Sequence, residues 1–295
     1  MVISHNISAL NTYKSLGLAG KYMNGSMEKL SSGYRINRAG DDAAGLSISE
    51  KMRSQIRGLK QAATNAENGV SMIQTAEGAL NETHSILQRM RELAVEASTD
   101  TNATEYREAL QSEVKQLSEE IQRIATTTEF NGMSILDGTK TNKTKDDPAG
   151  PDNSVYFHVG ANKGQVINVE FCDMGLKGLG LTRVEGTGEN AKDVFDIDVS
   201  TRDGANAAID KIDAAVKKVS TERSKYGAIQ NRLEYTINNL NTTGENMTAA
   251  ESTIRDVDMA KEIMEYTKNN ILQQAAQAML VQANARPQQA LQLLQ

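Results

Sequence analysis

The sequence contains few of the residues that usually build a large globular core. It has no tryptophan, and aromatic side chains make up only 4% of its 295 residues. Aromatic side chains normally contribute much of the area that a core buries. Only 3 prolines interrupt a chain that is rich in alanine, leucine, isoleucine and serine. This composition favours long helices packed at close range, and the length suggests about two domains.

Several classes of protein are disfavoured by what is missing. A single cysteine, Cys172, excludes an intrachain disulfide. The net charge of −6 argues against a nucleic-acid partner, because nucleic-acid binding needs a basic face. No stretch approaches ~18 continuous apolar residues, so we expect no membrane insertion. The first ten residues do not match a secretory signal, and such a chain stays in the cytosol unless a signal-independent route exports it.

Motifs that carry chemistry are equally scarce. His5, His84 and His158 lie in three separate predicted elements, and none is close to a cysteine or to a pair of acidic ligands. The sequence contains no H-E-x-x-H, C-x-x-C or phosphate-binding G-x-x-x-x-G-K pattern. We therefore predict no catalytic residues, no metal site and no cofactor, and an enzyme is the weakest of the functions considered.

Helical periodicity is the dominant signal in the first half of the chain. Apolar residues recur at helical spacing over residues 2–32, where three glycines each cost about 1 kcal/mol in a helix interior. Asp41 or Asp42 is expected to cap the next helix. From about residue 43 to 98, steps of three, four and seven follow a heptad repeat, with His84 on the same seam, which is typical of a coiled coil. A helix of that length is roughly 80 Å long, so we expect an elongated molecule. Residues 105–126 predict a second helix that folds back antiparallel.

The middle of the chain has a different character. VYFHV and VINVEF alternate apolar and polar residues around GANKG, which predicts a β-hairpin at about 155–172. FDIDV predicts one more short strand. Strand alternation places Cys172 on the same side as Asn168 and Glu170, so we expect it to be partly exposed. An inert thiol and an intermolecular disulfide both remain open for Cys172.

The last segment, from about residue 203 to 295, again keeps helical register, with a bend expected at Gly244. Its final 27 residues, from Asn269 on, carry one charge, Arg286. Apolar side chains there mark at least two faces of the helix. A helix that is apolar nearly all round is buried all round. Because the chain offers no large core, we expect neighbouring copies of the same chain to supply that burial.

Long segments at both ends resemble bacterial flagellin. At the start these are HNISALNTYKSL, LSSGYRINRAGDDAAGLSISEKMRSQIRGL, QRMRELAVEASTDTN and EFNGMSILDG; at the end they are AESTIRDVDMAKE and ILQQAAQAMLVQAN. The resemblance covers residues 1 to about 172 and about 203 to 295. It implies a structural subunit that polymerises into the extracellular flagellar filament for swimming motility. Hook–filament junction (hook-associated) proteins share the terminal pattern more weakly and are the alternative.

The resemblance also implies a domain map. Residues 1–42 with 257–295 would form a discontinuous domain of terminal helices lining an inner tube. Residues 43–202 with 203–256 would form a helical bundle, which includes the hairpin at about 155–172 and a short variable tip at about 137–202. The fold class expected is mainly α: an elongated antiparallel helical bundle built from both chain ends, without the large outer domains of many flagellins. The residues expected to pack the inner tube are Ile3, Ile7, Leu10, Leu16, Met23, Met27, Leu30, Met264, Ile271, Leu272, Ala275 and Met279.

Partners follow from the same resemblance. They are further copies of the chain, a flagellar export chaperone, the filament cap protein, a hook-associated junction protein and the type III flagellar export apparatus. The termini are expected to be disordered in the lone subunit and to fold during assembly. Arg89, Leu93 and Glu113 match the surface that the host flagellin-sensing Toll-like receptor reads in related flagellins. The same three residues would also fit a contact with the next subunit.

Overall fold

The computed structural model describes residues 6–100, 103–138, 154–185 and 192–292. Its packing divides the chain into two compact units. Unit 1 contains residues Met1–Ile56 and Gly244–Gln295, and unit 2 contains Arg57–Thr243. Unit 1 is therefore assembled from the two ends of the chain, whereas unit 2 is one continuous stretch.

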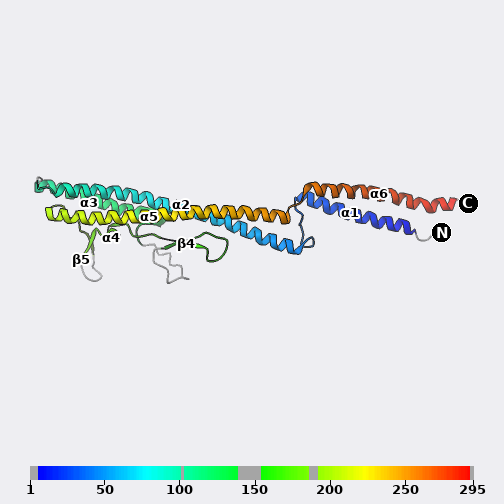
Figure 1. Ribbon diagram of the computed structural model, residues 1–295, viewed down its shortest axis with the longest axis horizontal. Helices are drawn as coiled ribbons and strands as arrows, with labels where there is room; N and C mark the ends of the chain where they lie inside the picture. Colours follow the sequence, from blue (N-terminus) through cyan, green and yellow to red (C-terminus); the bar gives the residue numbers. More distant parts are fainter. Residues whose placement is uncertain (1–5, 101–102, 139–153, 186–191, 293–295) are drawn as a thin grey trace. The chain divides into compact units, whose positions relative to one another are not determined.

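Helices make up most of the described chain (Figure 1). They are α1 (Ile7–Ser32), α2 (Ala43–Ala97), α3 (Thr104–Thr127), the four-residue α4 (Leu176–Leu179), α5 (Arg202–Arg255) and α6 (Met259–Gln292). The prediction of a mainly α fold is confirmed, and the bounds of α2 and α3 lie within two residues of those expected. α5 continues unbroken through Gly244, where we expected a bend, and the chain leaves the helix only after Arg255.

Both predicted cap positions before α2 have defined roles. The Asp42 carboxylate accepts a hydrogen bond from the Gly45 amide at 2.8 Å, so Asp42 caps the helix. Asp41 instead accepts from the amides of Asn37 and Arg38 and shapes the loop before the cap. A Cβ atom at Gly45 would lie 2.8 Å from the Ile36 side chain, which explains why glycine occupies the first turn.

The β-structure consists of three separate antiparallel pairs in the described residues. They are β1 (Glu129–Phe130) with β2 (Met133–Ser134), β3 (Ser154–His158) with β4 (Val166–Glu170), and β5 (Thr182–Glu185) with β6 (Lys192–Phe195). The β3–β4 pair confirms the predicted hairpin, with Phe157 opposite Ile167. Sequence patterns missed the other two pairs, whose strands have only two to four residues.

The predicted strand FDIDV is wrong beyond Phe195. Ile197 and Val199 are buried as the alternation implies, but no strand pairs with them in the described chain. The side chain of Gln111 takes the place of a strand: its Nε2 donates to the Ile197 carbonyl, and its Oε1 accepts from the Val199 amide. An alternating burial pattern therefore arises here without a sheet.

The core of unit 2 lies between α2, α3 and α5. Along α2 the buried residues alternate steps of four and three from Ala62 to Ala97, which confirms the heptad prediction. Thr83, 2% exposed, occupies the seam where we expected His84, and His84 is half-buried beside it. Val114 and Ile121 of α3 and Ile212, Val219, Tyr226 and Leu233 of α5 complete the same cluster.

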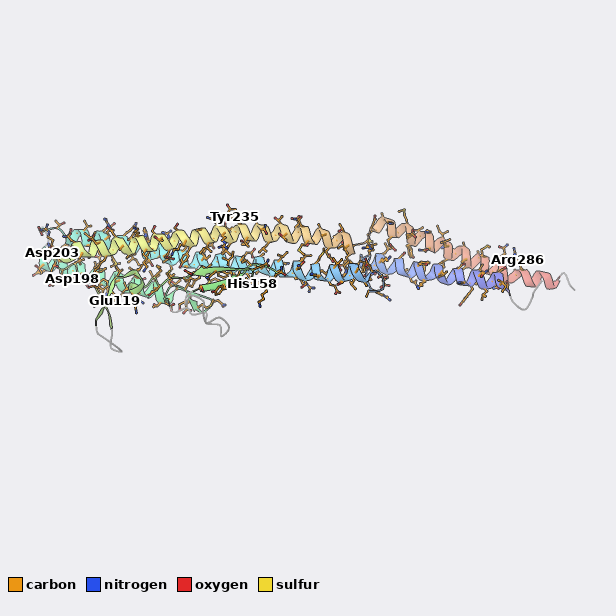
Figure 2. The ribbon with its side chains drawn as sticks, turned by 60° about the horizontal axis from the view of Figure 1, so that its bottom comes forward. Glu119, His158, Asp198, Asp203, Tyr235 and Arg286 are labelled. Atoms are coloured by element: carbon orange, nitrogen blue, oxygen red, sulfur yellow. The ribbon has the colours of Figure 1, made fainter. Side chains whose placement is uncertain are left out.

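Few large apolar side chains of unit 2 remain exposed. Tyr235 is the most exposed of them, at 77%, and it stands on the outer side of α5 (Figure 2). Most of the exposed large apolar side chains in the described chain belong instead to α1 and α6 of unit 1. Unit 2 is thus a self-contained bundle, whereas unit 1 leaves much of its apolar surface uncovered.

Candidate assembly interface

The helices α1 and α6 pack against each other in antiparallel directions within unit 1 (Figure 1). At one end, the Asn6 side chain caps α1 through the Ala9 amide and donates a hydrogen bond to the carbonyl of Ala283 at 2.8 Å. At the other end, Tyr34 forms an isolated β-bridge with Asp256. Asp258 caps α6 by accepting from the amides two and three residues ahead.

A heptad seam joins the two helices, and we call it the terminal seam. Both helices shield residues at alternating steps of three and four. On α1 these are Ala9, Thr12, Leu16, Ala19, Met23, Ser26 and Leu30, and on α6 they are Glu262, Tyr266, Asn269, Gln273, Ala276, Leu280 and Ala283. Small and polar side chains outnumber large apolar ones in this seam. The polar residues of this seam were not identified from the sequence. Their alternating spacing of three and four residues was the signal that could have identified them.

Several large apolar side chains of α6 lie on the side away from α1. Heptad geometry places Met264, Ile271 and Ala278, each seven residues apart, opposite the terminal seam. Met264 is 66% exposed and Ile271 is 61% exposed. Arg286, the one charged residue of the final stretch, is also exposed (Figure 2). The helix therefore shields a face of mixed polarity within its own subunit and presents large apolar side chains outward.

The structure divides the predicted inner-tube residues between two environments. Leu16, Met23 and Leu30 are half-buried in the terminal seam. The others in the described chain are exposed: Ile7, Leu10, Met27, Met264, Ile271, Leu272, Ala275 and Met279. Ile3 lies outside the described residues. The apolar residues predicted at helical spacing over residues 2–32 do not share one face, because Ile7, Leu10 and Met27 fall between the heptad positions that face α6.

The two connections between the helices of unit 1 pair with each other, and we call this pairing the linker clasp. The Arg35 amide donates to the carbonyl of Arg255 at 2.7 Å, and the Val257 amide donates to the carbonyl of Gly33 at 3.0 Å. Gly33 ends α1 with a φ of 75°, a left-handed conformation that glycine adopts without strain. The clasp fixes where α1 ends relative to the start of α6, and so fixes the register of the terminal seam.

Side chains from three segments reinforce the linker clasp. The guanidinium carbons of Arg53 and Arg255 lie 5.4 and 4.8 Å from the centre of the Tyr34 ring, within the range of cation–π attraction. Arg53 also donates to the Tyr34 hydroxyl and forms an ion pair with Glu251 at 3.0 Å. Glu251 has only 11% of its side chain exposed. Sequence patterns missed this cluster, because Tyr34 and Arg255 lie more than two hundred positions apart and its members share no motif.

The predicted receptor-recognition residues belong to unit 2. Arg89 forms ion pairs with Glu113 at 3.0 Å and with Glu92 at 3.2 Å, and hydrogen bonding to Glu113 raises the pKa of Arg89. The structure thus brings Arg89 of α2 and Glu113 of α3 together on the surface. Leu93 is only 1% exposed and lies in the core behind them.

The remaining chemical groups of the described residues bear on metal binding, membrane insertion and thiol chemistry. Among the described residues, no three His, Cys, Asp or Glu side chains converge to hold a metal ion. Within the same residues, no helix is long and apolar enough to span a bilayer. Cys172 is half-buried, as predicted, and burial together with Glu222 raises the pKa of its thiol. The reactive thiolate is thereby disfavoured, which supports the inert reading of Cys172.

Sequence comparisons identify the family of this chain. A profile of the bacterial flagellin N-terminal helical region matches residues 3–141, and a profile of the C-terminal helical region matches residues 209–294. The chain belongs to the bacterial flagellin family. It is 54% identical over 308 residues to the flagellin of Bacillus subtilis strain 168 and 52% identical over 294 residues to that of Halalkalibacterium halodurans, with 100% of each chain covered.

These relatives decide between the predicted alternatives. Coverage of whole flagellins supports a minimal flagellin, the form expected from the short segment between the helical ends. A structure described as a flagellar hook-associated protein of Vibrio parahaemolyticus has a TM-score of 0.56 and covers 73% of this chain and 100% of its own. At 16% identity it shows the fold alone, so the hook-associated alternative is not favoured.

The family defines the coarse function of the chain. It is a structural subunit that polymerises with further copies into the flagellar filament. The filament lies outside the cell and serves motility. Flagellins are structural proteins, so the chain is not an enzyme. The exposed apolar faces of unit 1 are accordingly candidate contacts between subunits.

Proposed function

We propose that α1 and α6 fold stably only as the subunit joins a growing filament, and that neighbouring copies cover their exposed apolar faces. The single observation that carries this proposal is the orientation of α6, which turns Ile271 and Met264 outward and Asn269 and Gln273 toward α1. A helix with that orientation is stabilised mainly by surfaces outside its own subunit.

The energetics of the lone subunit support coupled folding. Ordering one residue costs about 1–2 kcal/mol of backbone entropy, and isolated helices are marginal in water. Large apolar side chains occupy five of the fourteen positions of the terminal seam, which limits the apolar area that offsets that cost. The end of a filament would bury the outward apolar side chains, and each Å² of apolar surface so buried contributes roughly 25 cal/mol. Subunits would therefore remain soluble until they reach a filament end.

The proposed domain roles follow the helix borders. Residues 1–42 with 257–295 form the inner-tube domain, and residues 43–202 with 203–256 form the surrounding bundle with its short tip. These borders coincide with the start of α2 and with the break between α5 and α6. Packing within the chain groups residues 43–56 and 244–256 with the terminal helices as well. The predicted inner-tube residues serve as contacts, and the exposed amides Gln274 and Gln277 face the lumen.

Seeded polymerisation of purified subunits tests this proposal. A chain without residues 257–295 should remain a soluble monomer that cannot elongate filament fragments. Ile271→Asp should also stop elongation, because it places a charge on the outward apolar face. Gln274→Asp is the matched control: it adds the same charge to an exposed position of the same helix. Elongation by the truncated chain at the full-length rate, or equal elongation by the two Asp variants, would refute the proposal.

Export and assembly factors form a second part of the proposed function. The chain passes unfolded through the type III flagellar export apparatus, with an export chaperone on the C-terminal helix. The filament cap protein then guides insertion, and the hook-associated junction protein meets the first subunits. The outward apolar face of α6 supports a chaperone site, since an uncovered face of this kind promotes premature association. Chaperone binding that survives deletion of residues 257–295 would contradict this assignment.

Recognition by the host flagellin-sensing Toll-like receptor is the third part. The exposed ion pair of Arg89 and Glu113 supports a polar contact surface on unit 2. A receptor-reporter assay on the monomer should show a response that Arg89→Ala reduces. Arg91→Ala is the matched control, because Arg91 lies on the same helix as Arg89, is similarly exposed and is paired with Asp213 of α5. No response to the unmodified chain would end this proposal.

Leu93 requires a separate control because it is buried. Leu93→Ala is expected to reduce the receptor response, but it also leaves a cavity that typically costs 2–5 kcal/mol. Leu87→Ala removes a 0% exposed leucine from the same helix and serves as the control for lost stability. A response lowered equally by both substitutions would assign Leu93 to the core alone.

A further inference from the structure

Two seams in this chain share a heptad spacing but differ in content. The α2 seam of unit 2 includes Ile73, Leu80 and Leu87, each 0% exposed, beside several buried alanines and Thr83. The α6 side of the terminal seam instead carries Asn269, which is 8% exposed, and the half-buried Gln273. A polar side chain at a seam position specifies register at a cost in stability. The same chain therefore contains one seam suited to fold alone and one that is weakened.

The polar seam residues gain little from each other. Among the described residues, the side chains of Asn269 and Gln273 form no hydrogen bond with α1, and the side-chain hydrogen bond between the helix pair is the one from Asn6 to Ala283 at its far end. Ser26, 6% exposed, adds a third polar group on the α1 side. Polar side chains at these positions bury less apolar surface than leucine or isoleucine would, so the seam contributes less to the stability of the paired state.

We propose that Ser26, Asn269 and Gln273 keep the α1–α6 pair below the stability that it needs to form in an unassembled subunit. This inference rests on the proposed function, polymerisation coupled to folding, and assigns the coupling to three side chains of the terminal seam. The exposed apolar faces explain why assembly is favourable. The polar seam explains why the pair does not form beforehand, while the linker clasp still sets its register.

Replacement of the two α6 amides by leucine tests the inference in the full-length chain. Leucine has as many side-chain heavy atoms as asparagine and one fewer than glutamine, so Asn269→Leu with Gln273→Leu makes these two seam positions apolar with a small change in shape. Hydrogen exchange of the dilute monomer is measured over residues 6–32 and 259–286. Each substitution should raise amide protection there about tenfold, and the double variant should nucleate filaments without added seeds. A tenfold change in protection corresponds to about 1.4 kcal/mol.

A control variant separates seam effects from general hydrophobicity. Gln274→Leu with Asn284→Leu makes the same two exchanges at exposed positions of α6. This variant should retain the exchange rates of the unmodified monomer. Equal protection in the two double variants would overturn the inference, as would full protection of both terminal segments in the unmodified monomer. If the unmodified chain does not elongate seeds at all, the proposed function fails instead.

A substitution that makes the terminal seam more polar tests the same inference if the leucine variants are insoluble. Ala276→Asn adds one more amide to the half-buried terminal seam. It should raise the critical concentration for seeded elongation about tenfold. An unchanged critical concentration would contradict the role of the seam, even if the leucine variants could not be purified.

Discussion

Three glycines of α2 provide a sharp test of how the β3–β4 hairpin is held in unit 2. A Cβ atom at Gly58 would lie 3.0 Å from the Cβ and 3.3 Å from the Cα of Ala161 in the hairpin turn. At Gly69 it would lie 3.2 Å from the ring of Phe157, whereas at Gly78 it would meet nothing within 4 Å. The same Gly→Ala exchange in one helix therefore samples three degrees of crowding.

The expected magnitudes follow from two opposing effects. Alanine is favoured over glycine in a helix interior by about 1 kcal/mol, so Gly78→Ala should stabilise the protein by that amount. Overpacking costs typically 1–3 kcal/mol, and the backbone at Ala161 cannot move aside alone, so Gly58→Ala should destabilise by about 1 kcal/mol net. Gly69→Ala should lie between the two, because the Phe157 ring can rotate.

Thermal unfolding of the full-length monomer measures the series. The free energy of unfolding should differ by about 2 kcal/mol between Gly78→Ala and Gly58→Ala, which corresponds to roughly 4–8 °C in Tm. Hydrogen exchange of the β3–β4 amides should increase only in Gly58→Ala. If Gly58→Ala stabilises as much as Gly78→Ala, the hairpin turn does not rest on α2 at this position, and the reasoning is refuted.

Three further changes have defined expectations. Leu87→Ala should lower the free energy of unfolding by about 3 kcal/mol in urea titrations, because Leu87 is 0% exposed in the core. Glu251→Gln should lower the free energy of unfolding by about 1 kcal/mol, because the partly exposed Arg53 loses its ionised partner. A double-mutant cycle of Arg53→Leu and Glu251→Gln should show a coupling energy between the two residues, and a coupling energy of zero would contradict this. Two backbone amides lower the pKa of Asp41 from its ordinary 3.8, so this carboxylate contributes stability that is present above pH 3.8 and is lost as pH falls through the lower folded-state pKa. Asp41→Asn should remove that loss, measured as exchange of the Asn37 and Arg38 amides between pH 2 and 5.

The helices of this protein could be predicted from sequence because their signals are local and long. The seam of α2 repeats its heptad over the whole of residues 62–97, and Asp42 stands directly before the helix that it caps. The hairpin could be predicted for a similar reason, since its two alternating runs flank one short turn. Family resemblance then assigned a function that periodicity alone could not supply.

The features that escaped prediction depend on contacts between distant segments. Tyr34 lies between arginines from α2 and α5, and no local pattern joins those positions. Gln111 replaces a strand partner for residues 197–199, so the alternation there misled the strand assignment. Apolar residues of α1 and α6 were expected to act together, but only the structure shows which of them face the partner helix. A side chain that other copies bury in the filament is visible in a single subunit only as an exposed apolar side chain.

Electron cryomicroscopy of filaments grown from the full-length chain tests the central claim most directly. The claim is that other copies cover the face of α6 that its own subunit leaves exposed. In the filament, the side chains of Met264, Ile271 and Ala278 should be buried against neighbouring subunits, while Asn269 and Gln273 still face α1 of the same subunit. Filaments in which Met264 and Ile271 face water, with the amides of α6 packed between subunits, would contradict the account.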